Sequence, residues 1–232
     1  MQARAARYFG AAKKALGELR EYYTREAMDK RKIDEASPTF PFPTQYRCLH
    51  GEAGVGTLTY LSHYGENARP PKLLFLAKTG DGEEVLVKFV RRYSLEAHQW
   101  CMNAGFAPEL KGFQVIGDRW CMVVMEYLKD HVTLDKGEWK PERYKKDIRE
   151  KLSSLHRAGF VHGDIRDANI LVRCESEVAG SEKVWFIDFD WSGRIGEVCY
   201  PANLNQEIRR HEDAQDGKMI RPEHDMAMVD YM

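Results

Sequence analysis

A short polar loop carries the residues of this sequence with the clearest capacity for chemistry. Asp164 and Asn169 lie in the run His-Gly-Asp-Ile-Arg-Asp-Ala-Asn that begins at His162, and Asp188 ends the apolar run 184–187 farther along. Carboxylate and amide oxygens are the ligands that Mg²⁺ prefers, and a carboxylate beside a hydroxyl can accept its proton. Phosphoryl transfer needs such groups, because it depends mainly on positioning and charge neutralisation. We therefore predict Asn169 and Asp188 as metal ligands and Asp164 as the proton acceptor.

The loop also has a plainer interpretation. Polar residues between a helix and a strand often do no more than cap the helix and bond the backbone. The presence of Asp188 at the end of a second apolar run favours the chemical interpretation, because two linked motifs coincide by chance less often than one.

A lysine within an apolar strand is the next candidate. Residues 85–90 read Val-Leu-Val-Lys-Phe-Val, so Lys88 shares a strand face with Leu86 and Val90. A lysine that faces inward needs an anion, which a nucleotide phosphate or the carboxylate of Glu96 would supply. The alternatives are a solvated surface lysine and, for Glu96, an ordinary acid in the first turn of a helix.

The elements that would position these groups follow from periodicity and punctuation. Period-two patterns predict strands at 57–61, 73–77, 85–90 and 120–128, with a turn at 80–82 between the second and third. Ser94 as N-cap and Gly105 as terminator predict a helix over 95–104. Helical spacing predicts further helices from near the start to about residue 30 and over 141–157, and at most one short helix at 205–212.

Composition restricts the class of protein. With 43% hydrophobic residues in 232, the chain can bury a real core, and a net charge of −1 gives no general attraction to nucleic acid or anionic membranes. No apolar run is long enough to span a membrane.

The odd number of scattered cysteines favours a reducing, intracellular and cytoplasmic setting. The basic first residues suggest a mitochondrial presequence, but the helical pattern continues through acidic residues, which disfavours one.

Taken together, these motifs resemble the protein-kinase-like superfamily. The His-Gly-Asp form of the loop is similar to aminoglycoside and choline phosphotransferases and to small atypical kinases. The wider runs HGDIRDANILV at 162–172 and FIDFDWSG at 186–193 look like uncharacterised fungal kinase-like proteins. The resemblance implies ATP and Mg²⁺ as cofactors, Glu96 as the partner of Lys88, Met125 at the back of the nucleotide pocket, and backbone contacts to the base at Glu126 and Leu128.

The implied fold is α+β and two-lobed. We expect an N-terminal helix and proline-rich connector over 1–44, a β-rich small lobe over 45–128, and a short, mostly helical large lobe over 129–232. The N-terminal helix either packs on the domain behind it or contacts a partner.

The sequence departs from the kinase pattern in three places. No G-x-G-x-x-G precedes the lysine strand, and the turn at 63–72 holds only Gly65. Asp190 replaces the glycine of Asp-Phe-Gly, as a second-metal ligand or a solvent-facing group. The chain also lacks an Ala-Pro-Glu segment after that motif, which makes a conventional platform for protein substrates doubtful.

Two functions follow from these features. The first is an active phosphotransferase that acts on a hydroxyl of a protein or a small molecule. The second is a catalytically weak or inactive kinase-like module that binds partners. Arg166 keeps the positive charge that serine/threonine kinases carry as lysine at that place, but it does not select an acceptor.

Overall fold

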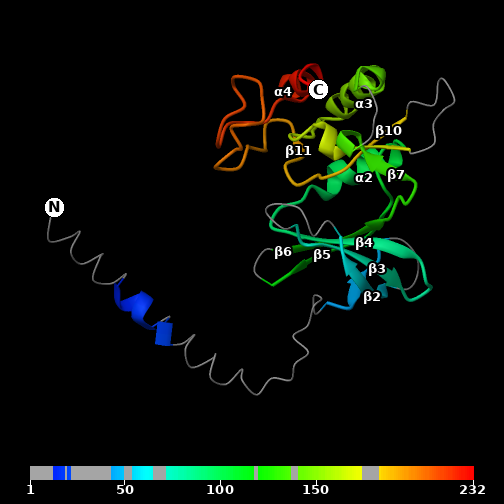
Figure 1. Ribbon diagram of the computed structural model, residues 1–232, viewed down its shortest axis with the longest axis vertical. Coiled ribbons are helices and arrows are strands. Elements are labelled where there is room, and N and C mark those ends of the chain that lie inside the picture. The colour runs from blue at the N-terminus through cyan, green and yellow to red at the C-terminus, as the bar shows by residue number, and fades with distance from the viewer. Residues whose placement is uncertain are drawn as a thin grey trace. The chain divides into compact units, whose positions relative to one another are not determined.

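The computed structural model describes residues 13–18, 20–21, 43–49, 54–64, 72–117, 120–136, 141–173 and 183–232 (Figure 1). The chain divides into two compact units, Met1–Phe42 and Pro43–Met232. In the first unit the described residues are helical, as predicted; the remainder of that predicted helix and most of the connector lie outside the described residues. The second unit contains all the predicted site residues.

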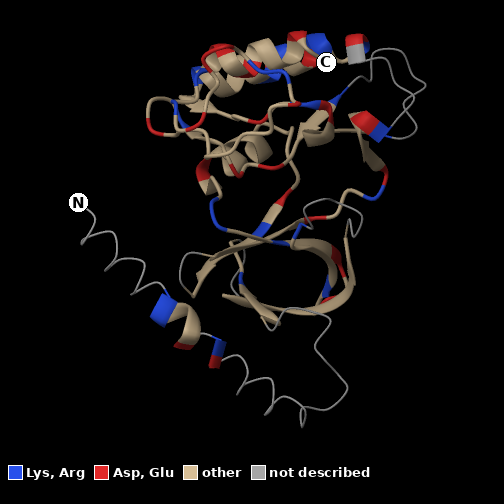
Figure 2. Ribbon diagram, turned by 60° about the vertical axis from the view of Figure 1, so that its left-hand side comes forward, with Lys and Arg blue, Asp and Glu red and all other residues tan. Residues whose placement is uncertain are grey.

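The small lobe of the second unit is a curved antiparallel sheet. Among the described residues its strand order is β1-β2-β3-β4-β6-β5. The two edges also meet, because Cys48 after β1 pairs with Gly112 in β5, and the sheet curls into a nearly closed barrel (Figure 2). A Cβ at Gly112 would lie 2.3 Å from the ring of Tyr46, so a side chain there would prevent this closure. The strands are β1 (Gln45–Arg47), β2 (Val55–His63), β3 (Leu74–Thr79), β4 (Glu84–Val90), β5 (Leu110–Ile116) and β6 (Trp120–Glu126).

The sequence patterns located most of this lobe. Strands β2, β3, β4 and β6 lie where alternation predicted them, and Gly82 adopts a φ of +90° in the predicted turn between β3 and β4. Strands β1 and β5 were not predicted. Strand β1 is only three residues long, and β5 is interrupted by a glycine where its pairing with β6 shifts register. Neither strand therefore shows a clean alternation.

Helix α2 (Leu95–Asn103) follows the small-lobe lysine strand, begins where predicted and ends one residue earlier than predicted. The Ser94 hydroxyl accepts the backbone N–H of Ala97 as an N-cap, and Gly105 adopts a left-handed φ of +82° after the helix. The buried residues of α2 pack against the large lobe. Leu95 and Met102 of the same helix pack against the small-lobe core, so α2 contacts both lobes.

The large lobe is built around helices α3 (Lys145–Arg157) and α4 (Pro222–Asp230), which lie side by side at the end of the unit away from the sheet (Figure 1). Tyr144, Ile148, Leu152 and Leu155, the face predicted for α3, are fully buried. Short elements join these helices: η2 (Leu134–Lys136), η3 (Pro141–Arg143), η4 (Asp167–Asn169), β7 (His131–Thr133), β8 (Phe160–Val161), β9 (Ile170–Arg173), β10 (Val184–Phe186) and β11 (Gly193–Arg194).

The segment between β11 and α4 contains no helix, so the short helix allowed at 205–212 is absent. Side-chain oxygens take the backbone N–H groups that a helix would use. The Asn205 Oδ1 accepts the N–H of Glu207 at 2.9 Å, and the Asp216 carboxylate accepts those of Asn203 and Leu204. Among the described residues, no helix has the length and apolarity needed to cross a membrane.

Candidate active site

The loop that begins at His162 is anchored to helix α4 by a buried carboxylate. Strand β8 delivers the chain to His162, and the Asp225 carboxylate of α4 accepts the backbone N–H groups of His162 and Gly163, each at 2.8 Å. Asp225 is 1% exposed and also lies 3.0 Å from the His156 ring nitrogen. Gly163 has a φ of +85°, a conformation that glycine adopts without strain. The loop is therefore anchored before it reaches Asp164.

Asp164 and Asn169 form one hydrogen-bonded unit. The Asn169 Nδ2 donates to the backbone oxygen of Asp164 and to its Oδ2, each at 2.8 Å. The Asn169 side chain is buried, and its Oδ1 has no hydrogen-bond partner among the described residues. Leaving a buried polar atom unpaired costs free energy. An amide oxygen held in this way is suited to bind a hard cation such as Mg²⁺.

Asp188 lies beside this unit at the end of β10. The backbone N–H of Ile187 donates to the Asn169 carbonyl at 3.1 Å, which places Asp188 next to the loop. Asp188 itself adopts a left-handed φ of +69°, a strained backbone for a residue that is not glycine. Such strain concentrates at functional sites because surrounding contacts must maintain it.

Two carboxylates share the buried ammonium of Lys88. The Lys88 Nζ lies 2.6 Å from Asp188 Oδ1 and 2.6 Å from Asp190 Oδ1, and the residue is 8% exposed. Burial lowers the pKa of Lys88, but the two carboxylates outweigh it and the pKa is raised overall. For Asp188, burial is outweighed by Lys88 and Lys72, and the pKa is lowered. Burial, followed by the charge of Asp188, raises the pKa of Asp190 to about 7.

The expected pairing of Lys88 with Glu96 is wrong for this structure. The Glu96 carboxylate lies 2.8 Å from Arg194 of β11, and both side chains are more than half exposed. Glu96 stands in the first turn of α2, on the side that faces solvent. Asp190, in the place of the usual glycine, supplies the second carboxylate instead. Asp190 therefore faces the lysine rather than bulk solvent.

The phenylalanine between these two aspartates is fixed by helix α2. The rings of Phe189 and His98 stack with centroids 4.6 Å apart and planes 7° apart. His98 is 1% exposed, one ring nitrogen faces the Pro108 carbonyl oxygen at 2.8 Å, and the other faces the Tyr93 hydroxyl. A neutral imidazole satisfies both contacts, as donor to the carbonyl and acceptor from the hydroxyl.

Lowering the pH is expected to destabilise the fold through His98. Burial lowers the pKa of His98 from 6.5 to about 4. Between these two values the unfolded chain binds more protons than the folded chain, so the free energy of unfolding falls as the pH drops. From pH 7 to pH 5 this contribution amounts to about 2 kcal/mol.

Urea unfolding of the wild type and of His98→Gln at both pH values measures this contribution. Other titrating groups, including buried His162, contribute to both proteins and cancel in the difference. We expect the wild type to have the larger free energy of unfolding at pH 7. At pH 5 its difference from His98→Gln should be about 2 kcal/mol smaller. A gap of equal size at the two pH values would contradict the assignment of a neutral buried imidazole.

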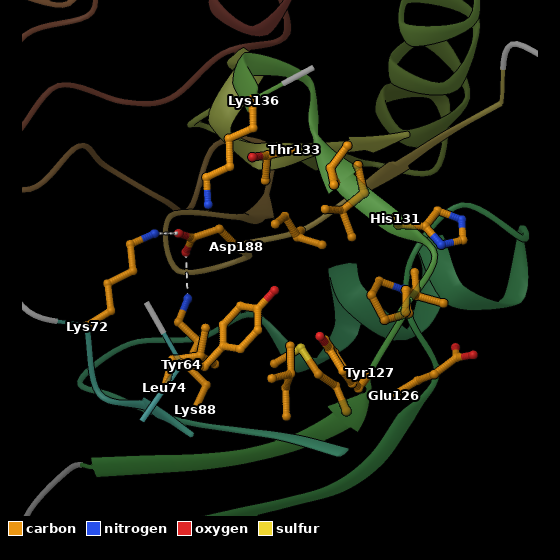
Figure 3. A pocket seen from close by; sticks show the side chains of 17 residues that line it. Tyr64, Lys72, Leu74, Lys88, Glu126, Tyr127, His131, Thr133, Lys136 and Asp188 are labelled. Carbon is orange, nitrogen blue, oxygen red and sulfur yellow. Dashed lines mark hydrogen bonds and ion pairs between the residues drawn. The ribbon is translucent and has the colours of Figure 1, made fainter. Parts of the chain in front are cut away.

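A pocket opens beside Lys88 and Asp188, between the small-lobe sheet and the first elements of the large lobe (Figure 3). Met125, Glu126 and Leu128, the residues assigned to the nucleotide base by resemblance, all line it. One end is largely apolar and the other is cationic. The apolar side chains come from both lobes and are Leu74, Leu86, Pro108, Met125, Leu128, Val132, Leu171 and Ile187.

Two arginines also contact Asp164, one at each carboxylate oxygen. The Arg166 Nε donates to Asp164 Oδ2 at 3.1 Å, and the Arg210 Nη2 lies 3.3 Å from Asp164 Oδ1. The Arg210 side chain is 7% exposed, and its guanidinium carbon lies 5.1 Å from the centroid of the Trp191 ring. Both oxygens of Asp164 thus carry positively charged neighbours.

The structure brings together the predicted residues Lys88, Asp164, Asn169 and Asp188, and leaves Glu96 outside. Sequence reasoning missed Lys72, Asp225 and Arg210. Neither Lys72 nor Arg210 belongs to a recognisable motif: Lys72 directly precedes an apolar strand, and Arg210 is the second of two adjacent arginines. Asp225 had one weak signal, an acid in the first turn of a terminal apolar segment.

Comparison with known proteins gives a family match over part of the chain. Residues 121–218 match the Lipopolysaccharide kinase (Kdo/WaaP) family. Vaccinia related kinase 3 has a similar structure, with a TM-score of 0.54 and 16% identity over 84% of this chain and 68% of that one. The kinase PK-1 of Cydia pomonella granulovirus aligns with a TM-score of 0.46 and 19% identity.

That second alignment covers 60% of this chain and 53% of the granulovirus kinase, so the chain spans about half of its length. No curated protein sequence matches the chain. The loop motif, the two-lobed α+β fold and the family match together make the chain a member of the protein-kinase-like superfamily.

Proposed function

We propose that the chain is an ATP- and Mg²⁺-dependent phosphotransferase with a hydroxyl acceptor on a protein or a small molecule. The observation that carries this proposal is the convergence of Lys88 and Asp188 at the cationic end of a pocket whose other end is apolar. A nucleotide has the matching distribution, with a flat base at one end and anionic phosphates at the other. Asn169 is joined to the residue before Asp188 by a backbone hydrogen bond, and its side chain hydrogen-bonds Asp164.

Each residue then has one task. Asp188 and the unpaired Oδ1 of Asn169 fit Mg²⁺, which when bound supplies charge neutralisation at the phosphates. Lys88 donates to phosphate oxygens. Asp164 takes the proton of the acceptor hydroxyl. The oxygen of that hydroxyl forms a bond to the terminal phosphorus as the bond from this phosphorus to the nucleoside diphosphate breaks. Backbone groups at Glu126 and Leu128 bind the edge of the base.

The acceptor class is open between proteins and small molecules. The matched family is named for lipopolysaccharide, and that match supports including a sugar hydroxyl among the acceptors to be tested. The similarity to vaccinia related kinase 3 concerns the fold alone and does not favour a protein acceptor.

One observation favours a variant of the inactive kinase-like module, one that still binds nucleotide but does not transfer phosphate. Arg166 and Arg210 occupy both oxygens of Asp164. Because each oxygen already has a guanidinium partner, an acceptor hydroxyl would have to displace one of these charge-assisted contacts to reach Asp164. The two candidates differ in phosphate transfer but agree on binding.

Thermal unfolding with and without Mg-ATP, combined with release of labelled terminal phosphate, tests the proposal. At about 100 times its dissociation constant, Mg-ATP should stabilise the wild type by about 2.7 kcal/mol. We expect Asp188→Asn to lose most of the Mg²⁺-dependent part of this stabilisation and to release no labelled phosphate to water or acceptor. A wild type that is stabilised but transfers nothing supports the binding module. Equal phosphate release by both proteins would refute an enzymatic site at Asp188.

A further inference from the structure

The cationic end of the pocket holds three lysines from both lobes around one carboxylate (Figure 3). Lys72 lies just before β3 and Lys88 within β4, whereas Lys136 ends η2 in the large lobe. The Lys72 Nζ lies 3.0 Å from Asp188 Oδ2, on the other oxygen from Lys88. In Figure 3 the Lys136 side chain extends toward the same carboxylate from the opposite side.

These charges do not balance. Three ammonium groups face Asp188, and the only further acid that an ion pair brings to them among the described residues is Asp190, through Lys88. At least one positive charge is left over at this end of the pocket. The Lys72 side chain is 49% exposed and Lys136 is exposed, so a ligand can reach both without rearrangement of the core.

The sequence around Lys72 adds a second observation. A glycine-rich loop binds phosphates through several backbone N–H groups that its glycines leave accessible. The sequence that joins β2 to β3 has one glycine, Gly65, and Lys72 just before β3 lines the pocket. Side-chain ammonium groups are therefore placed where such a loop would present its amides.

We propose that Lys72 and Lys136, one from each lobe, bind the terminal phosphates of the nucleotide and replace the backbone cradle of a glycine-rich loop. This inference rests on the proposed nucleotide-binding function. Lys72 exchanges the Asp188 carboxylate for phosphate oxygens when the nucleotide enters, so its charge stays paired in both states. Because the two lysines belong to different lobes, the phosphates hold the lobes together at the mouth of the pocket.

Affinities for Mg-ATP and for adenosine, measured by calorimetry, test this proposal with four proteins. These are the wild type, Lys72→Gln, Lys136→Gln and the control Lys78→Gln, which removes an exposed lysine of β3 that does not line the pocket. We expect each pocket variant to bind Mg-ATP about tenfold more weakly, the value of one charge-assisted hydrogen bond, and to bind adenosine as the wild type does. The control should match the wild type with both ligands.

The outcomes separate this proposal from the one on which it rests. Unchanged Mg-ATP affinity in both pocket variants would overturn the lysine assignment while leaving the nucleotide site intact. Equal losses for Mg-ATP and adenosine would overturn it too, because they would indicate a distorted pocket rather than a lost phosphate contact. A wild type that binds neither ligand would defeat the nucleotide function itself, and this inference with it.

Discussion

Replacing Asp164 with asparagine is expected to lower the rate of phosphate transfer by about 10²- to 10⁴-fold, the range for loss of a general base. Asparagine keeps the shape of the side chain and an oxygen that can accept the hydrogen bond from Asn169, but it cannot take up the proton of the acceptor. The nucleotide pocket is lined by other residues, so Mg-ATP should stabilise the variant as it does the wild type.

Single-turnover transfer of labelled phosphate measures this effect without interference from product release. The matched control is Asp167→Asn in the same loop. Its carboxylate accepts only a hydrogen bond from the neighbouring backbone N–H of Ala168 among the described contacts, at 2.9 Å. Transfer by the control should stay close to that of the wild type. Similar losses in the two variants would show that the loop, and not proton transfer at Asp164, limits the rate.

Replacing Asp225 with alanine is expected to lower the free energy of unfolding by about 3–5 kcal/mol, a large share of the stability of a typical domain. The change leaves the buried backbone N–H groups of His162 and Gly163 without their acceptor. Asp225→Asn should lose less, because its amide oxygen can still accept one of the two N–H groups. Both changes also weaken the anchoring of the loop that carries Asp164.

Urea unfolding of these variants beside Asp230→Ala separates the role of burial from that of charge. Asp230 lies on the same helix, but its side chain is 63% exposed and pairs with Arg149 at the surface. Surface ion pairs of this kind contribute about 0–1 kcal/mol. If Asp225→Ala and Asp230→Ala cost the same, the anchoring role of Asp225 would be wrong.

Local patterns in the sequence located the parts of the site that lie within one element. The polar loop, the lysine of β4 and the cap of α2 each depend on a few neighbouring residues, and each was predicted. What could not be predicted depends on pairs far apart in the chain. Lys72 meets Asp188 across 116 positions, and Asp225 meets Gly163 across 62.

Glu96 shows the same limit of local patterns in a residue whose position was predicted. Its place at the start of α2 was predicted correctly, yet the direction of its side chain depends on how the helix rotates against the large lobe. The buried side of α2 carries Ala97, His98 and Cys101. That packing turns Glu96 toward Arg194. Periodicity in the sequence does not reveal whether Glu96 or Asp190 is the partner of Lys88.

The left-handed backbone of Asp188 limits which substitutions at that position are informative. Alanine there would combine the loss of a carboxylate with a backbone penalty, because a Cβ atom disfavours positive φ and alanine has no polar side chain to offset this. Glycine would relieve the backbone strain, but it would also remove the carboxylate that pairs with buried Lys88. Asparagine tolerates the same φ, so its effects report the missing charge alone.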